Sequence, residues 1–288
     1  MIHNESAAAY HTRPAVSAGL LWDITQECPA YAYARSVFCP EEKRIREETK
    51  EMNFGRAVHF AGLQPELWED QVTVIDAKDY RTKAAQEYRE MARFAGKTPL
   101  LAADVDLIAK LRQAILESAA GPWFEEGACE QSVTFEFGAS PEDPLGQLSM
   151  PCKLRVDCVA PFAGGPLLDL KTAQTANPEA FSRACTTWGH HLRAAWYKDG
   201  WLASEGERRP YVFVIVSKTE PHLVETYVLD DRSEEWGRRL YRRALAEVRL
   251  ALEEGKWRSY SAAGEKKPTI ISLPAFAERQ LIEAFAAN

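Results

Sequence analysis

Residues 210–218, PYVFVIVSK, constrain the fold more than any other segment of this chain. They are an unbroken run of apolar residues, mostly β-branched or aromatic, which predicts a strand buried on both faces. The segment LVETYVLD at 223–230 alternates between apolar and polar residues, so it is expected to pair with that strand. Because a strand buried on both faces needs covering layers above and below, we expect a sheet between two layers of helices.

The order of the remaining predicted elements indicates an α/β fold with a mixed central β-sheet flanked by helices on both faces. Three closely spaced strands, at 130–138, 149–161 and 167–172, are expected to form an antiparallel meander, and a further short strand is expected at 71–77. In the first part of the chain, helices are predicted at 16–36 (N-cap Ser17, break at Pro29), 40–50, 54–63 (ended by Pro65) and 79–118. The last of these is interrupted near 96–104 and ends in a helix capped by Gly121. Further along, we predict one long helix over 177–204, an arginine-rich helix from about 231 and, after a loop, a short final helix.

Two acids and a lysine lie within these strands, where a charge is costly to remove from water. Asp169 and Lys171 share one face of their strand, with Leu168 and Leu170 behind them, and the turn at 161–166 can bring Asp157 beside Asp169. Adjacent carboxylates repel unless a proton or cation lies between them, and their oxygens suit Mg²⁺ or Mn²⁺. The alternative is a buried ion pair between Asp169 and Lys171, with Asp157 an unrelated surface residue.

The charge balance bears on nucleic-acid binding. The chain has 35 Lys and Arg against 42 Asp and Glu, a net charge of −7, whereas a protein that coats DNA by charge alone would be basic. Positive charge is concentrated on the arginine-rich helix, where Arg238, Arg242 and Arg249 can share a face. That face either tracks phosphates or is a solvated surface paired with nearby acids, namely Glu234, Glu235 and Glu247.

The segments LRVDCVAP and GGPLLDLKTAQTANPEAF, followed by GHHLRAAWYKDGW, resemble the PD-(D/E)XK nuclease superfamily, and more closely its RecE-type branch, exonuclease VIII and its phage relatives. YHTRPAVSAGLLWDITQECPAYAYA and NFGRAVHFAGLQPE resemble two upstream segments of that family, so the resemblance extends from about residue 10 to 202. It implies a restriction-endonuclease-like core and one nuclease domain over 1–288, with a helical N-terminal part at about 16–120, the core at about 128–230 and C-terminal helices at about 231–288.

The resemblance also implies roles for individual residues. Asp157 and Asp169 would be metal carboxylates, His59 the third side-chain ligand, the carbonyl of Leu170 a backbone ligand and Lys171 the catalytic lysine, with Mg²⁺ as the ion and Mn²⁺ as its substitute. Without the resemblance, His59 would be interpreted as a core histidine. Glu130 stands where the family often has an acid, so it is either a further metal ligand or a solvent-exposed residue at a strand end.

The helix after the meander departs from the family pattern of Gln followed four residues later by Tyr. Arg193 and Tyr197 stand at those positions here and share a helix face, so the arginine either binds a phosphate or marks a divergent substrate contact. His191 keeps the family's histidine position or lies on a polar helix face. The expected DNA-binding residues are therefore Arg193, Tyr197, His191, Thr172, Arg238 and Arg242.

The activity that the resemblance implies is a Mg²⁺-dependent exonuclease that digests double-stranded DNA from its ends in the 5′→3′ direction. The 3′ single-stranded tail would pass to a RecT-like annealing protein. A ring-shaped homo-oligomer, trimer or tetramer, would enclose DNA within a positive inner wall, while its acidic exterior stays free of DNA. The expected location is the cytoplasm of a bacterial or phage-infected cell, with no membrane partner, since no signal peptide or membrane-length apolar run stands out.

Three other functions remain open at this stage. They are a non-catalytic DNA-binding protein on a nuclease fold, a Cas4-like or repair nuclease of different polarity, and a metal hydrolase that does not act on nucleic acid. The six cysteines are scattered, with no C-x-x-C pair, so they provide no framework for an iron–sulfur cluster. We expect them to be reduced and mostly buried thiols.

Overall fold

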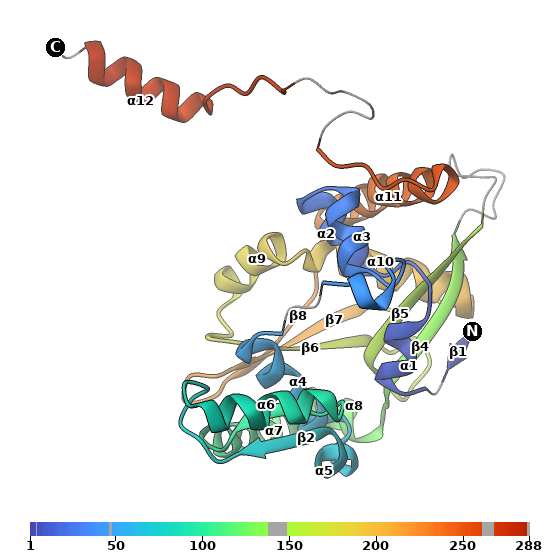
Figure 1. Ribbon diagram of the computed structural model, residues 1–288. Coiled ribbons are helices and arrows are strands. Elements are labelled where there is room, and N and C mark those ends of the chain that lie inside the picture. The colour runs from blue at the N-terminus through green and yellow to red at the C-terminus, as the bar shows by residue number, and fades with distance from the viewer. Residues whose placement is uncertain (4, 46–47, 138–148, 261–267, 287–288) are drawn as a thin grey trace.

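A mixed six-stranded sheet forms the centre of the computed structural model, which describes residues 1–3, 5–45, 48–137, 149–260 and 268–286 (Figure 1). The strands follow one another in the order β1 (Ile2–His3), β4 (Ala128–Phe137), β5 (Met150–Val159), β6 (Leu167–Ala173), β7 (Tyr211–Ser217) and β8 (Val224–Tyr227). Neighbours are antiparallel except β6 and β7, which are parallel. The predicted meander and the predicted pairing of β7 with β8 are confirmed, whereas the two-residue edge strand β1 was not predicted.

Helices cover both faces of this sheet, as predicted (Figure 1). One face carries α2 (Ala18–Gln26), α3 (Pro29–Arg35), α9 (Pro178–Thr187), α10 (His190–Glu205) and α11 (Asp231–Glu254). The other carries α4 (Lys50–Leu63), α7 (Val105–Glu117) and α8 (Gly121–Glu126), with α6 (Lys83–Phe94) further from the sheet. Strand β7 is buried along its whole length and supplies alternate side chains to the two hydrophobic clusters on the two faces. The segment that most constrained the fold is therefore a strand covered by helices on both faces, between β6 and the edge strand β8.

Smaller elements complete the described chain. Strands β2 (Val72–Ile75) and β3 (Thr98–Leu101) form a separate two-stranded parallel sheet, with α6 as the connection between them. Short helices α1 (Ala7–Thr12) and α5 (Trp68–Gln71) and 3-10 turns at Glu41–Lys43, Pro65–Leu67 and Ala102–Asp104 link the larger elements. In the part of the chain that the structure describes, no helix has the length and apolar character needed to cross a membrane.

Three sequence expectations about helices are wrong. The long helix predicted from Pro178 is divided into α9 and α10 at Gly189, whose φ is +67° and whose added Cβ would lie 2.4 Å from the Trp22 ring. Among the described residues of the predicted helix at 40–50, which are 40–45 and 48–50, there is a 3-10 turn at Glu41–Lys43, and α4 begins only at Lys50. Gly121 starts α8 instead of capping α7, which ends at Glu117 with Ser118 as its C-cap, and the interruption near 96–104 contains β3.

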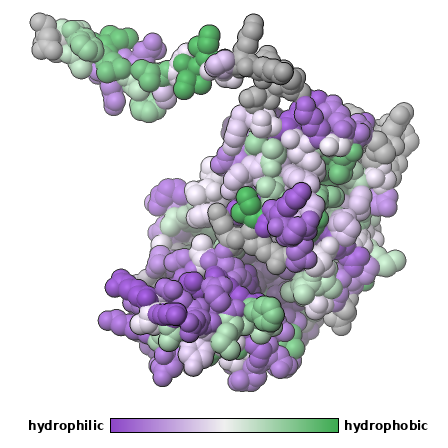
Figure 2. All heavy atoms as spheres, in the orientation of Figure 1, coloured by the Kyte–Doolittle hydropathy of each residue, from purple (hydrophilic) through white to green (hydrophobic). Residues whose placement is uncertain are grey.

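The C-terminal arm, residues 268–286, extends away from the body of the molecule (Figure 1). Its helix α12 (Ala275–Ala286) has no buried residue. Apolar side chains gather on the arm, where Ile270 is 95% exposed and Phe285 is 78% exposed (Figure 2). Because exposed apolar surface of this kind is unusual on an isolated chain, the arm is a surface that a partner could cover.

Candidate active site

The site forms where strands β5 and β6 separate. Their ladder pairs Cys158 with Leu168 and Val159 with Leu167, so the next residues in that register are Asp157 and Asp169. At this point the Asp157 carboxylate accepts a hydrogen bond of 2.7 Å from the backbone N–H of Leu170. The side chain thus satisfies a backbone donor at the divergence of the strands, and the two acids are close together as predicted.

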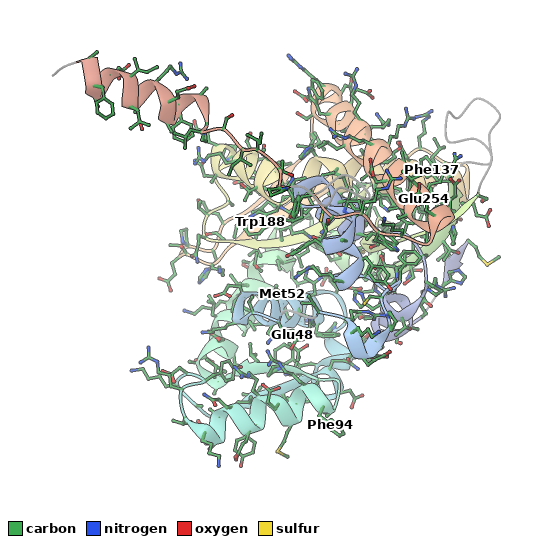
Figure 3. All side chains as sticks on the ribbon, turned by 45° about the horizontal axis from the view of Figure 1, so that its top comes forward. Glu48, Met52, Phe94, Phe137, Trp188 and Glu254 are labelled. Atoms are coloured by element: carbon green, nitrogen blue, oxygen red, sulfur yellow. The ribbon has the colours of Figure 1, made fainter. Side chains whose placement is uncertain are left out.

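Helix α4 brings His59 to the same place. Figure 3 labels Met52 in the first turn of α4 and Glu48 just before the helix. Residues Ala57, Val58 and Ala61 are buried and hold the helix against the sheet. His59 Nε2 donates to the carbonyl oxygen of Leu170 at 2.9 Å and lies 3.8 Å from Asp157 Oδ2.

Glu130 completes a cluster of three possible metal ligands. One ligand atom each from His59, Glu130 and Asp157 lies within 4.8 Å of the others. The Glu130 backbone has a φ of +55°, which is uncommon outside glycine and stores local strain, often at functional sites. Arg155 fixes the carboxylate by donating to Glu130 Oε2 at 2.6 Å, and it also donates to Ser132 at 2.6 Å.

Asp169 and Lys171 form an ion pair beside this cluster. The Lys171 amine contacts Asp169 Oδ1, and it also lies 3.2 Å from the Leu170 carbonyl oxygen and 3.7 Å from Asp157 Oδ2. The alternative of an ion pair between Asp169 and Lys171 is therefore correct for the pair itself, but its second half is wrong, because Asp157 is part of the same cluster and not an unrelated surface residue. The second oxygen of Asp169, Oδ2, is buried and has no hydrogen-bond partner among the described residues.

The surroundings move the pKa values of the two aspartates in opposite directions. Burial raises the pKa of Asp157 to about 6, although His59 and Lys171 oppose the rise. Burial acts on Asp169 as well, but the charges of Lys171 and Arg193 lower its pKa to about 2. Asp169 is therefore ionised at neutral pH, whereas Asp157 gains or loses its proton at a pH close to neutral.

His59 and Glu130 support each other's charged forms. Burial opposes a charged imidazole, but the Asp157 charge and the contact with Glu130 raise the pKa of His59 above its ordinary value. Burial would raise the pKa of Glu130, but His59 and Arg155 hold it below its ordinary value. Each of these two side chains thus favours the charged form of the other.

These donors fit a divalent cation of the Mg²⁺ or Mn²⁺ type. Carboxylate and carbonyl oxygens are the ligands that such ions prefer, and imidazole is an accepted addition for Mn²⁺. The unpartnered Oδ2 of Asp169 is a buried anionic atom for which the described protein supplies no donor, as expected beside a cation site. Of the predicted ligands, His59 and Asp157 converge with Glu130, while Asp169 lies next to them in its pair with Lys171.

Arg193 on α10 is a predicted DNA contact whose charge acts on Asp169. Burial disfavours its charge, but Asp169 and Tyr197 raise its pKa, so it remains a cation. Its guanidinium makes no hydrogen bond or ion pair with the residues that the structure describes, which leaves its donors available to an anion. Tyr197 is 9% exposed and packs edge-on against Tyr211, so it lies behind the site surface.

The other predicted DNA contacts lie in different surroundings. His191 Nδ1 lies 2.8 Å from the carbonyl oxygen of Cys185, and Thr172 lies beside Gly55 of α4. Arg238 donates to both carboxylate oxygens of Asp199, at 2.7 and 3.0 Å. On the arginine-rich helix the ion-paired alternative therefore describes Arg238, although with Asp199 as well as the expected Glu235. The charge of Arg242 lowers the pKa of its neighbour Tyr241, although burial outweighs this effect and raises that pKa.

Two further residues, Lys153 on β5 and His11 on α1, lie near the site and were not among the predicted site residues. Lys153 of β5 donates to the carbonyl oxygens of Tyr10 and Arg13, at 2.8 Å each, and so ties the end of α1 to the sheet. His11 lies within the electrostatic reach of Arg56 and Glu130, and burial lowers its pKa to about 4. The YHTRP segment at 10–14 was the available signal, because it opens the region of family resemblance.

Comparison with known proteins agrees with this architecture. Residues 17–265 match the model of a family described as "PDDEXK-like domain of unknown function (DUF3799)". The crystal structure of a candidate exonuclease from Eubacterium rectale has a TM-score of 0.59 with this chain at 12% identity, over 96% of this chain and 98% of that chain. At that identity the likeness shows a shared fold, which confirms the predicted PD-(D/E)XK-like α/β core.

Two other comparisons add less. The crystal structure of SSO0001 covers 66% of this chain and 84% of that chain at 16% identity, with a TM-score of only 0.29, which is too low to carry an argument. No curated protein matches the sequence significantly.

Proposed function

We propose a function from one established premise: the chain belongs to the family of PDDEXK-like domains described as DUF3799. On that premise, the protein is a divalent-metal-dependent nuclease that hydrolyses phosphodiester bonds of DNA. The finer proposal is an exonuclease that digests duplex DNA from an end in the 5′→3′ direction. Support for exonuclease action comes from the RecE-type motifs in the sequence and from the name of the Eubacterium rectale structure.

One observation carries the proposal. Side chains from three separate elements, α4, β4 and β5, converge with the Leu170 carbonyl and the Asp169–Lys171 pair of β6. His59 is 111 residues from Leu170 in the chain, so local sequence does not bring them together. A purely structural cluster has no need of a strained Glu130 backbone or an unpartnered Asp169 oxygen.

The roles of the residues follow from their positions. His59, Glu130, Asp157 and the Leu170 carbonyl would hold a divalent ion, which, when bound, polarises a phosphate and acidifies a water molecule. The Lys171 amine can orient a water molecule or neutralise charge on the phosphate, because it already lies between Asp157, Asp169 and the Leu170 oxygen. The Arg193 guanidinium is the donor group that can bind a phosphate oxygen next to these acids.

The partners are proposals as well. Duplex DNA ends are the proposed substrate, and a RecT-like annealing protein is the proposed recipient of the 3′ tail. Self-association into a ring of three or four copies is supported by the exposed apolar side chains of the C-terminal arm, which need a covering surface. The acidic net charge of −7 fits a molecule that restricts its DNA contacts to an inner wall.

The direct test uses linear duplex labelled at the 5′ end or the 3′ end, and a covalently closed circle, with Mg²⁺ or EDTA. Wild-type protein should release the 5′ label early, from linear DNA only and with Mg²⁺ only. Asp157→Asn should lose the activity, and Lys171→Ala should lower it at least a hundredfold, in the range of removing one electrostatic group from an active site.

Lys110→Ala is the matched control, because Lys110 pairs with Glu220 on the exposed surface. It should retain wild-type activity. Early release of the 3′ label would reverse the polarity and leave the nuclease proposal intact. Binding of DNA without cleavage in Mg²⁺ and in Mn²⁺ would replace the proposal with a non-catalytic DNA-binding protein.

A further inference from the structure

Two thiols face each other directly beside the acids of the site. Cys129 of β4 and Cys158 of β5 are cross-strand partners in the antiparallel ladder, and their sulfur atoms are 2.8 Å apart. Cys129 immediately precedes Glu130, and Cys158 immediately follows Asp157. Of the six cysteines, this is the one pair whose sulfurs contact each other within the described residues.

We propose that Cys129 and Cys158 are a reversible oxidation site, at which a peroxide converts the two thiols into a cross-strand disulfide that perturbs the neighbouring carboxylates. The disulfide does not depend on the proposed function, whereas its effect on the metal centre rests on it.

The backbone geometry allows this bond. Directly opposed residues of antiparallel strands have Cα atoms about 4.5–5.5 Å apart, within the ~4.4–6.8 Å that a disulfide spans. A sulfur–sulfur bond is about 2.05 Å long, so the sulfurs need to approach each other by only about 0.8 Å. No backbone rearrangement is needed before the bond can form.

The two sulfurs differ in their access to an oxidant. Cys158 is fully buried, whereas Cys129 is partly exposed. Cys129 lines a surface cavity of about 400 Å³, together with Gly62, Gln64 and Arg112 among others. A small peroxide can therefore reach Cys129 from this cavity, while Cys158 is positioned to resolve the product.

The chemistry balances with hydrogen peroxide as the oxidant. The Cys129 sulfur attacks a peroxide oxygen, the O–O bond breaks, and Cys129 becomes a sulfenic acid as one water is released. The Cys158 sulfur then attacks the Cys129 sulfur, the S–O bond breaks, and the S–S bond forms with release of a second water. Two thiols and one peroxide thus yield one disulfide and two waters, and a thiol reductant reverses the change.

Disulfide formation would alter the contacts that hold α8. Cys158 Sγ now donates to the Trp123 carbonyl oxygen at 3.3 Å, and Cys129 Sγ to that of Phe124 at 3.6 Å. Oxidation removes both S–H donors and places a covalent bond between the residues adjacent to Glu130 and Asp157. Because supporting changes around metal ligands commonly cost 10–100-fold in metal affinity, we expect Mn²⁺ to bind about tenfold more weakly.

The first experiment maps the bond. Metal-free full-length protein is treated with stoichiometric hydrogen peroxide, free thiols are blocked, and peptides are analysed by mass spectrometry with and without dithiothreitol. A linked 129–158 peptide should appear in the wild type and disappear with reductant. Cys129→Ser should prevent the link, and Cys152→Ser should not, because Cys152 is as buried on β5 as Cys158 but its sulfur donates to the Met150 carbonyl oxygen and not to another cysteine.

The second experiment measures Mn²⁺ binding to the reduced and the peroxide-treated protein. Weaker binding after oxidation in the wild type, but not in Cys129→Ser, is the expected result. Absence of the 129–158 peptide, or oxidation of Cys129 to sulfinic acid without a link, would overturn the disulfide. Unchanged Mn²⁺ binding by the linked protein would overturn the coupling. Reduced protein that binds no Mn²⁺ would instead count against the proposed metal centre, while the peptide map would still decide the disulfide.

Discussion

Replacing Lys171 by Met tests whether the charges of the site are coupled as the structure indicates. In the metal-free protein, this substitution removes the ion-pair partner of Asp169, which is only 2% exposed. Removing one partner of a buried ion pair costs about 3–5 kcal/mol, because the other charge remains buried. Since the Arg193 charge also stabilises Asp169, we expect the lower end, about 3 kcal/mol of unfolding free energy.

The assay is urea-induced unfolding at pH 7 in EDTA for a double-mutant cycle. It compares the wild type, Lys171→Met, Asp169→Asn and the double variant. Because the double variant removes both charges of the pair, it should be more stable than the sum of the single effects predicts, by about 2 kcal/mol. Lys110→Met is the control, since its pair with Glu220 is exposed and should contribute about 0–1 kcal/mol.

Added Mn²⁺ extends the same test. An ion that binds only the folded state stabilises it by about 2.7 kcal/mol at a hundredfold excess over Kd. Loss of the Lys171 cation should favour binding of another cation, so Mn²⁺ should stabilise Lys171→Met more than the wild type. A coupling energy below about 0.5 kcal/mol, or equal destabilisation by Lys110→Met, would refute the reasoning.

Three further predictions concern stability and pH. Gly189→Ala should destabilise the protein by about 2 kcal/mol or more in urea unfolding, because alanine disfavours a positive φ and its Cβ would clash with Trp22; an unchanged midpoint would contradict this. Asp157 has a pKa raised to about 6, so in EDTA its contribution to the unfolding free energy should fall as pH rises from about 4 to 6. Mn²⁺ affinity should fall by up to about tenfold per pH unit below 6, because protons compete with the ion for this carboxylate. Calorimetric titrations that show neither trend, or the same trends in Asp157→Asn, would exclude this group as the cause. Burial lowers the pKa of Lys153 to about 8, so the unfolding free energy of the wild type relative to Lys153→Met should rise between pH 8 and 10. The rise should be at most about 1.4 kcal/mol per pH unit. A difference that does not change with pH would be evidence against a perturbed amine.

Much of the fold follows from local sequence patterns, because the spacing of apolar residues along a strand predicts which of its faces are buried. The unbroken apolar run of β7 and the alternation of β4 and β5 predicted the sheet and its meander. The break at Gly189 was missed, since glycine is tolerated inside helices and only the approach of Trp22 from α2 requires it. Strand β3 is four residues long and too short for its pattern to separate it from a helical interruption.

The site was predicted in part, for a physical reason that differs from residue to residue. Asp157, Asp169 and Lys171 lie on adjacent strands joined by a short turn, so alternation was enough to bring them together. His59 is far away in sequence and required the family resemblance. The ion pairs of Arg238 depend on how α10 packs against α11, which no single segment encodes.

The positive φ of Glu130 is the feature that strand alternation could not have predicted. It bears on which cation pairs with which carboxylate in the site. With Glu130 brought into the cluster by a positive φ, three carboxylates meet three cations. Arg155 holds Glu130 and Lys171 holds Asp169, whereas the guanidinium of Arg193 is held by no described residue in a hydrogen bond or ion pair. A cation that stays charged without a fixed partner beside a cluster of acids is best placed to bind an incoming phosphate. Arg193→Gln, which restores the residue type of the RecE-type pattern, should therefore weaken DNA binding while leaving Mn²⁺ binding intact. A loss of Mn²⁺ binding with unchanged DNA binding would show that Arg193 serves the acids and not the substrate.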